Sequence, residues 1–258
     1  MQTLLRPLRI LFFVYALVIL VPAFLVFMIF YFLAFSLLPA ARAPHLAHRY
    51  VTRNGAFILL AILFIRVKFK NKNLVDPGKT YVFIANHQSQ LDIPAFARSC
   101  SNTFRFLAKA ELMKVPVLGY IIRKLYISVN RSDKSDRARS MENMMASLRE
   151  NISVFICVEG TRNRTDKPLL EFKDGAFRLA IESQLPLAVL TVIDSKKLLD
   201  SNRHFEMSPG TIHCEWSVPI ETKGMTAEDL PRLKQMAREM MLASLEATER
   251  DEAMGKMS

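Results

Sequence analysis

An uncharged run from residue 10 to residue 41 places the strongest constraint on how this chain can fold. It exceeds the roughly 20 residues that a helix needs to cross a bilayer, and the apolar core of a signal peptide is only about 7–15 residues long. Pro22 lies inside the run and can kink or split a helix. We therefore expect an N-terminal membrane anchor over residues 1–54, either one tilted span or a helical hairpin. Basic residues at both ends of the run favour the hairpin, with both ends in the cytoplasm.

Positive charge is concentrated in the same part of the chain. Nine Lys or Arg residues and no Asp or Glu precede Asp76, and they flank apolar runs instead of forming an exposed stripe. This layout favours phospholipid headgroups over nucleic acid, because each basic residue near an anionic bilayer contributes about 1 kcal/mol. A second apolar stretch, residues 56–65, is too short to span a bilayer and is predicted to be a buried or interfacial helix.

After Lys72 the sequence changes to short β-branched runs that alternate with helical periodicity. Strands are predicted at residues 80–85, 125–129, 152–158, 185–193 and 213–218, and helices at residues 92–98, 110–124, 135–149 and 174–183. Thr226 and Asp229 give a capping-box pattern that opens a last helix. These elements predict an α/β layer fold over residues 55–225, followed by a C-terminal amphipathic helix and tail over residues 226–258.

The cysteines, and the histidines outside the motifs below, give no sign of a metal site. Cys100, Cys157 and Cys214 are widely spaced and form no CxxC pair, and His204 and His213 lie far in sequence from other ligand types. We expect free thiols in a reducing compartment and no bound metal.

The most informative motif, NHQSQLD at residues 86–92, directly follows the first predicted strand. A strand end that leads into a helix is where α/β sheets place ligand sites. His87 can remove a proton near neutral pH, and Asp92 can accept a hydrogen bond from its Nδ1 and hold the imidazole. Taken alone, such a pair is more often structural than catalytic.

A second motif, EGTR at residues 159–162, follows the strand predicted at residues 152–158. Gly160 permits close backbone approach with amides that can face an anion, and Arg162 can grip a phosphate with its forked guanidinium. Arg131, just after the strand predicted at residues 125–129, is a further phosphate-binding candidate. The plainer interpretation of each is an ordinary turn or a solvated arginine.

The order of these sites gives the chain a resemblance to the lysophosphatidate (1-acyl-sn-glycerol-3-phosphate) acyltransferase family of the H-x4-D glycerolipid acyltransferases. The family's NHxSxxD block is matched at residues 86–92, its arginine-ended block at Arg131, its EGTR block at residues 159–162 and its F-K-x-G-A-F stretch at residues 172–177. Its K-x-E-L…P…G segment is matched by Lys109, Glu111, Leu112, Pro116 and Gly119, and its proline-containing strand at Pro186.

Four positions depart from the family pattern. Cys157-Val158 stands where the family has Phe-Pro, Asn163 where it has serine, and Val189 where it has a second proline. These departures remove no chemically essential group.

The resemblance implies a mixed central sheet flanked by helices. It also implies acyl transfer from acyl-CoA or acyl carrier protein to the sn-2 hydroxyl of 1-acyl-glycerol-3-phosphate, with His87 as general base held by Asp92. Arg131, Arg162 and the Gly160 amides would hold the acceptor phosphate beside Thr161, and Glu159 would orient Arg162 or the glycerol. Asn86, Ser89 and Lys109 would support the site. No cofactor is implied, and the partners are membrane phospholipids, the lysophosphatidate acceptor and the acyl donor.

Three alternatives stay open from the sequence. In the first, the protein is an acyltransferase of the same superfamily whose acceptor is another lysophospholipid, glycerol 3-phosphate or a lyso-aminolipid. In the second, water is the acceptor and the protein is a thioesterase or lipid hydrolase. In the third, the protein is a non-catalytic membrane adaptor that has kept the fold. The short chain and the absence of an evident sorting signal favour a bacterial inner membrane, with the active site facing the cytoplasm.

Overall fold

The centre of the molecule is a strand, β2 (Val82–Ala85), in which every side chain is buried. An uninterrupted apolar run of this kind is expected where helices cover both faces of a sheet. β2 pairs in parallel with β5 (Ser153–Cys157) on one side and with β6 (Leu187–Ile193) on the other. This computed structural model describes residues 5–39, 42–115, 118–130, 132–203 and 205–255.

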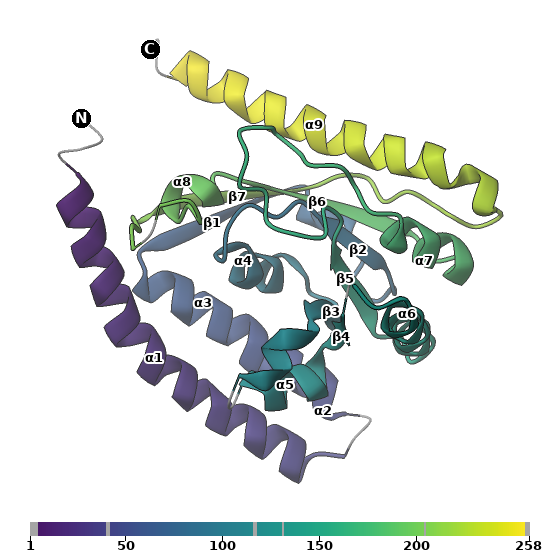
Figure 1. Ribbon diagram of the computed structural model, residues 1–258, viewed down its shortest axis with the longest axis horizontal. Coiled ribbons are helices and arrows are strands. Elements are labelled where there is room, and N and C mark those ends of the chain that lie inside the picture. The colour runs from purple at the N-terminus through teal and green to yellow at the C-terminus, as the bar shows by residue number, and fades with distance from the viewer. Residues whose placement is uncertain (1–4, 40–41, 116–117, 131, 204, 256–258) are drawn as a thin grey trace.

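Seven strands of the described chain form one sheet in the order β1-β7-β6-β2-β5-β3-β4 (Figure 1). The other strands are β1 (Ile65–Lys70), β3 (Phe104–Lys109), β4 (Ile127–Val129) and β7 (Gly210–Trp216). Within these described strands the β6–β7 pair is antiparallel and the other neighbouring pairs are parallel. The expected mixed central sheet is therefore confirmed.

Helices cover both faces of the sheet. One face packs against α6 (Lys134–Arg149), α7 (Gly175–Ser183) and α9 (Leu230–Gly255), and the other against α3 (Arg53–Ile62) and α4 (Asp92–Ser99), as Figure 1 shows. The shorter helical elements are α2 (Ala43–Leu46), η1 (Ala47–Thr52), η2 (Lys72–Leu74), η3 (Ala110–Lys114), α5 (Leu118–Leu125), α8 (Ser195–Leu198) and η4 (Ala227–Asp229). The helices predicted at residues 92–98, 135–149 and 174–183 are confirmed to within one residue at either end.

The N-terminal apolar run forms one unbroken helix, α1 (Arg6–Leu37), that continues through Pro22. The hairpin that the flanking charges favoured is therefore wrong. At about 48 Å, α1 is long and apolar enough to cross a membrane. Yet α1 also contacts the rest of the described chain at two points along its length. The Tyr15 hydroxyl donates to the carbonyl of Ile62, and the Tyr31 hydroxyl bonds the Thr52 hydroxyl. In Figure 1, α1 runs beside α3 instead of projecting away from the domain.

Two strands, β1 and β3, were absent from the sequence prediction. β1 alternates strictly between inward apolar and outward basic side chains, from buried Ile65 and exposed Arg66 onward. Its basic residues were interpreted as the flank of an apolar run, so its period of two was overlooked. The apolar stretch of residues 56–65 is accordingly divided, because α3 ends at Ile62 and β1 begins at Ile65.

The C-terminal helix packs against the sheet. The predicted capping box is confirmed, with the Thr226 amide donating to Asp229 Oδ2 at 2.9 Å. Four side chains at i, i+4 spacing then enter the core: Leu233, Ala237, Met241 and Leu245. The division into an anchor, an α/β domain and a C-terminal segment stays a prediction.

Candidate active site

Two adjacent parallel strands, β2 and β5, end at the same edge of the sheet and carry the two sequence motifs. The chain leaves β2 toward α4 on one face and leaves β5 toward α7 on the other. Such a reversal of direction is where open α/β sheets form ligand-binding crevices. The motifs are joined directly, because the Val158 amide donates to the Ala85 carbonyl at 3.1 Å and the Asn163 amide to the His87 carbonyl at 2.7 Å.

His87 and Asp92 meet as the spacing predicted. His87 Nδ1 lies 2.8 Å from Asp92 Oδ2, and the Asp92 side chain is fully buried while that of His87 keeps 15% of its surface exposed. The same oxygen also accepts from the amides of Gln88 and Ser89, at 2.6 and 2.8 Å. A carboxylate with two amide donors is an acceptor, so Nδ1 carries the hydrogen and Nε2 is left free to accept a proton.

Asn86 and Ser89 fix the turn between β2 and α4. The buried Asn86 amide donates to the Val192 carbonyl and accepts from the Val192 amide, both at 2.8 Å, and so ties the end of β2 to β6. Ser89 Oγ donates to the Leu199 carbonyl at 2.7 Å. Both side chains therefore act on the position of His87 through the backbone.

Glu159 supports the same turn from the neighbouring strand. Its Oε1 accepts from the His87 amide at 3.0 Å and its Oε2 from the Leu170 amide at 2.8 Å. Burial raises the pKa of Glu159, and these two amide bonds oppose the rise. The expected contact with Arg162 is not among the interactions of the described residues. Glu159 therefore supports the site by holding two backbone amides, those of His87 and Leu170.

The EGTR turn presents Arg162 to the site. Gly160 has a φ of +70°, and its amide donates to the Cys157 carbonyl at 3.0 Å, so it does not face an anion as expected. Thr161 is exposed. Arg162 Nη1 lies 3.1 Å from Ser201 Oγ. Burial lowers the pKa of this guanidinium, and the nearby charge of Asp92 opposes the shift.

The two remaining predicted residues lie apart from this cluster or outside the description. Lys109, at the end of β3, is exposed and pairs with Glu111 at 3.0 Å. Arg131 lies outside the described residues, and so does Pro116 of the same family pattern.

A cavity with a largely apolar lining, called the hollow between α6 and α7 below, lies beside the EGTR turn. It has a volume of about 880 Å³, is bounded by α6, α7 and the ends of β4 and β5, and reaches Glu159, Gly160 and Thr161. Its apolar lining comes from Leu107, Val129, Met141, Met144, Ile156 and Val158. Lys134 and Lys173 also border it, so the hollow combines apolar walls with cations at the motif end.

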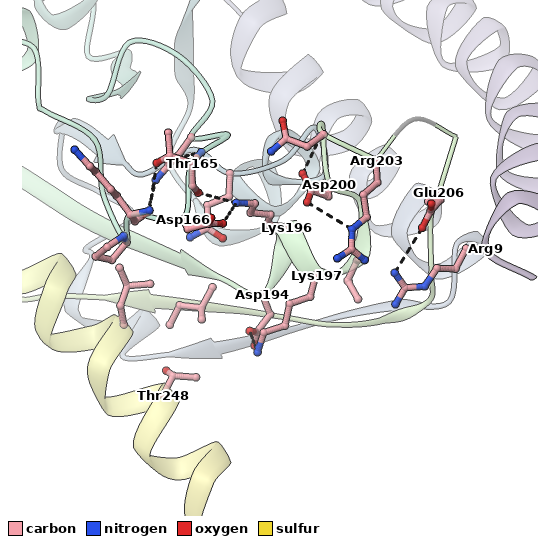
Figure 2. A pocket seen from close by; sticks show the side chains of 18 residues that line it. Arg9, Thr165, Asp166, Asp194, Lys196, Lys197, Asp200, Arg203, Glu206 and Thr248 are labelled. Carbon is pink, nitrogen blue, oxygen red and sulfur yellow. Dashed lines mark hydrogen bonds and ion pairs between the residues drawn. The ribbon is translucent and has the colours of Figure 1, made fainter. Parts of the chain in front are cut away.

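A second hollow, of about 620 Å³, is polar and borders the catalytic turn at Gln88 and Asn163. Figure 2 shows its labelled acids and bases in pairs. Lys196 with Asp166 and Arg9 with Glu206 join segments distant in sequence, whereas Lys197 with Asp194 and Arg203 with Asp200 are local pairs three residues apart. Through Arg9, α1 is thus joined to Glu206. Leu199 and Ser201, which precede Glu206 in the chain, bond Ser89 and Arg162.

Several supporting residues escaped the sequence analysis. Asn163 had been noted only as a departure from the family serine, yet its side chain organises the following loop by donating to the Lys167 carbonyl and accepting from Thr165. Ser201 and Leu199 contribute through a loop remote in sequence, where no local pattern marks them.

Comparisons with known proteins identify acyltransferases as relatives of this chain. The acyltransferase family model matches residues 66–193. An uncharacterized acyltransferase of Schizosaccharomyces pombe is 33% identical over 186 residues, which cover 70% of this chain and 66% of that protein. The 1-acyl-sn-glycerol-3-phosphate acyltransferase alpha of Homo sapiens is 27% identical over 216 residues, covering 82% and 75%. The human beta enzyme is 30% identical over 174 residues, covering 66% and 61%.

The solved structure of the 1-acyl-sn-glycerophosphate acyltransferase PlsC from Thermotoga maritima shares the fold, with a TM-score of 0.77 at 21% identity, covering 96% of this chain and 98% of that one. The chain spans slightly less than two thirds of the yeast relative and of the human beta enzyme. The solved structure shows the shared fold alone, whereas the family match and the relatives show that the chain belongs to the acyltransferase family that contains the 1-acyl-sn-glycerol-3-phosphate acyltransferases.

Proposed function

We propose that the protein transfers a fatty acyl group from acyl-CoA or acyl carrier protein to the sn-2 hydroxyl of 1-acyl-glycerol-3-phosphate, and so forms phosphatidic acid. The observation that carries the proposal is the His87–Asp92 pair, 2.8 Å apart at the switch point of the sheet. The names of the human relatives supply the acceptor.

In the proposed reaction, His87 Nε2 removes the proton from the acceptor hydroxyl as its oxygen attacks the thioester carbonyl. The tetrahedral intermediate collapses with loss of the thiolate, which receives the proton from His87. Asp92 stabilises the imidazolium that exists between these two proton transfers. Direct attack of this kind requires neither a metal ion nor a covalent enzyme intermediate.

Arg162 is the proposed partner of the acceptor phosphate. Its guanidinium lies near Asp92, and its hydrogen-bond partner within the described residues is a neutral hydroxyl, that of Ser201. A phosphate dianion would be a stronger acceptor for its forked donors. Arg131 is proposed to add a second cation, and Lys109 to support the same edge of the sheet.

The hollow between α6 and α7 is the proposed site of the transferred acyl chain. Its volume falls within the range of small-molecule pockets, and methionine side chains such as Met141 and Met144 adapt readily to flexible apolar ligands. Because the hollow reaches Glu159, whose carboxylate bonds the His87 amide, a chain lying there would place its thioester near the catalytic turn.

The apolar helix α1 associates the protein with the membrane in which acceptor and product reside. We propose the bacterial inner membrane as its location, with the active site on the cytoplasmic side. The acyl donors considered above are cytoplasmic, and the basic residues before Asp76 suit an anionic inner leaflet.

The test is acyl transfer by the purified protein from labelled acyl-CoA, and separately from acyl carrier protein, to lysophosphatidate. We expect phosphatidate from the wild type and a loss of about 10²–10⁴-fold in His87→Ala. Exchange of Asp92 for Asn should also reduce the rate. Equal product from His87→Ala would refute the proposed base. Free fatty acid released without an acceptor would indicate a hydrolase, and activity confined to another lysolipid would replace the acceptor.

A further inference from the structure

Three basic side chains, those of Arg53, Lys72 and Arg98, lie close together away from the active site. Arg53 begins α3, Lys72 begins η2 after β1, and Arg98 lies in the last turn of α4. Arg98 is six residues beyond Asp92 on the same helix, about 9 Å along its axis. The cluster therefore lies toward the end of α4 that points away from His87.

No carboxylate compensates these charges among the described residues. Lys72 Nζ donates to the Arg98 carbonyl at 3.0 Å and lies 4.6 Å from the ring centre of Phe69. The Arg98 guanidinium lies 4.9 Å from the ring centre of Phe57. Arg53 Nε is buried and makes no hydrogen bond to the rest of the described chain.

The surroundings make this arrangement unfavourable without a counter-ion. Burial and the neighbouring charges of Arg53 and Arg98 lower the pKa of Lys72, and burial and Arg53 lower that of Arg98. Buried His48 stands beside the cluster with its Nε2 unbonded within the described structure. Burial, Arg53 and His45 lower its pKa to about 3, so its imidazole is neutral at pH 7 and adds no charge to the cluster. The three cations repel one another, so an anion bound among them would be favourable.

The apolar neighbours indicate what kind of anion would fit. A hollow of about 770 Å³ is lined by Phe57, Leu60, Phe64, Arg66, Lys68 and Arg98. Phe57 and Phe64 are 55% and 65% exposed, and Phe64 lies against Tyr15 of α1 at 6.4 Å between ring centres. Free phosphate would not use this apolar surface, whereas a phospholipid would place its headgroup on the cations and a chain along the aromatic rings.

We propose that Arg53, Lys72 and Arg98 bind the phosphate of an anionic phospholipid whose acyl chain lies in the hollow between α3 and β1, at a site separate from His87. The site would hold the catalytic domain against anionic membranes at a fixed orientation, with the apolar face of α1 in the same bilayer. It does not depend on the identity of the acyl acceptor.

The experiment measures flotation of the full-length protein with phosphatidylcholine vesicles that contain or lack phosphatidylglycerol. Lys72→Gln and Arg98→Gln should each weaken binding to the anionic vesicles about fivefold, because one basic residue near an anionic surface contributes about 1 kcal/mol. Binding to the neutral vesicles should not change. Lys223→Gln, which removes one exposed charge elsewhere, is the matched control and should have a smaller effect.

Conservative variants, competition by inorganic phosphate and an activity assay separate binding of a lipid phosphate from other causes of weaker binding. Lys72→Arg and Arg98→Lys should restore binding if charge is what the site requires, and loss in these variants as well would overturn the proposal. Inorganic phosphate that displaced the protein from anionic vesicles, at an ionic strength matched with chloride, would overturn the lipid assignment. An equal effect of Lys223→Gln would do the same. Acyl transfer in detergent should be unchanged in Lys72→Gln and Arg98→Gln, so the two proposals fail separately.

Discussion

The backbone amide of His87 donates to Glu159 Oε1 at 3.0 Å, and this bond holds the two motifs of the active site together. The second oxygen of the same carboxylate holds the Leu170 amide, so one side chain connects β2, β5 and the loop before α7. A glutamate that follows β5, the neighbour of the central strand β2, thus fixes the position of the histidine without touching its imidazole.

Exchange of Glu159 for Ala should therefore reduce both stability and turnover. It leaves two amides without their acceptor, which costs about 1–3 kcal/mol per buried group. We expect a lower midpoint of thermal unfolding and a lower kcat, with the KM for lysophosphatidate little changed because the proposed phosphate contact of Arg162 remains. Glu111→Gln, at an exposed carboxylate paired with Lys109, is the control. A Glu159→Ala effect confined to KM would instead indicate direct contact with the acceptor.

Gly160→Ala tests the backbone of the EGTR turn. The φ of +70° disfavours any residue with a Cβ, and that atom would lie 3.2 Å from Lys173 Cγ. The strain of the left-handed conformation is about 1–2 kcal/mol, so thermal stability and activity should both fall. Gly175→Ala is the matched control, since no atom lies within 4 Å of its added Cβ and alanine favours the helix. Similar results for the two variants would contradict this account of Gly160.

The pH dependence of stability should carry the signature of His48. Its pKa is lowered from 6.5 to about 3 in the folded protein. Between these two pH values the unfolded chain therefore binds a proton at this histidine and the folded chain does not. Stability therefore falls as the pH falls below about 6.5, by up to about 1.4 kcal/mol per pH unit. Thermal unfolding in detergent should show a shallower acid limb for His48→Phe. His45→Phe, at an exposed histidine, should keep the wild-type slope, and a steep limb in His48→Phe would exclude the assignment.

Much of the fold could be predicted because local pattern and burial agreed. The apolar runs of β2, β5 and β6 are buried on both faces, and the His87–Asp92 spacing is closed by the turn that starts α4. β1 was missed because its outward Arg66 and Lys68 resemble a membrane-facing basic flank, and charge alone does not distinguish the two.

The partners of Glu159 and Arg162 could not be predicted from the sequence. Glu159 bonds Leu170 and Arg162 bonds Ser201, and both contacts depend on how distant loops return to the sheet edge. Likewise, the continuity of α1 through Pro22 is a tertiary effect, because α3 and η1 pack along the helix on both sides of that residue.

Arg162→Ala should raise the KM for lysophosphatidate far more than it lowers kcat. Loss of a hydrogen bond to a charged group costs about 1.5–3 kcal/mol, which corresponds to an increase of roughly tenfold to a hundredfold. Arg162→Lys should recover only part of this, because an ammonium cannot reproduce the forked geometry. Arg164→Ala, two residues on and exposed, controls for local charge. Steady-state kinetics with varied acceptor makes the distinction, and an unchanged KM would remove Arg162 from the phosphate site.

If the hollow between α6 and α7 holds the acyl chain as proposed, its lining should set the preferred chain length. Met141 lines the hollow from α6, whereas Met145, one turn further on, packs against the core without lining it. Met141→Trp should fill part of the volume, and each methylene that can no longer be buried costs about 0.8 kcal/mol of binding. The kcat/KM for long-chain acyl-CoA should therefore fall while that for short-chain donors is kept. Met145→Trp serves as the control for the bulk of the ring. If both variants lose long and short donors equally, the chain lies elsewhere, and if neither changes the preference, the hollow is not part of the donor site.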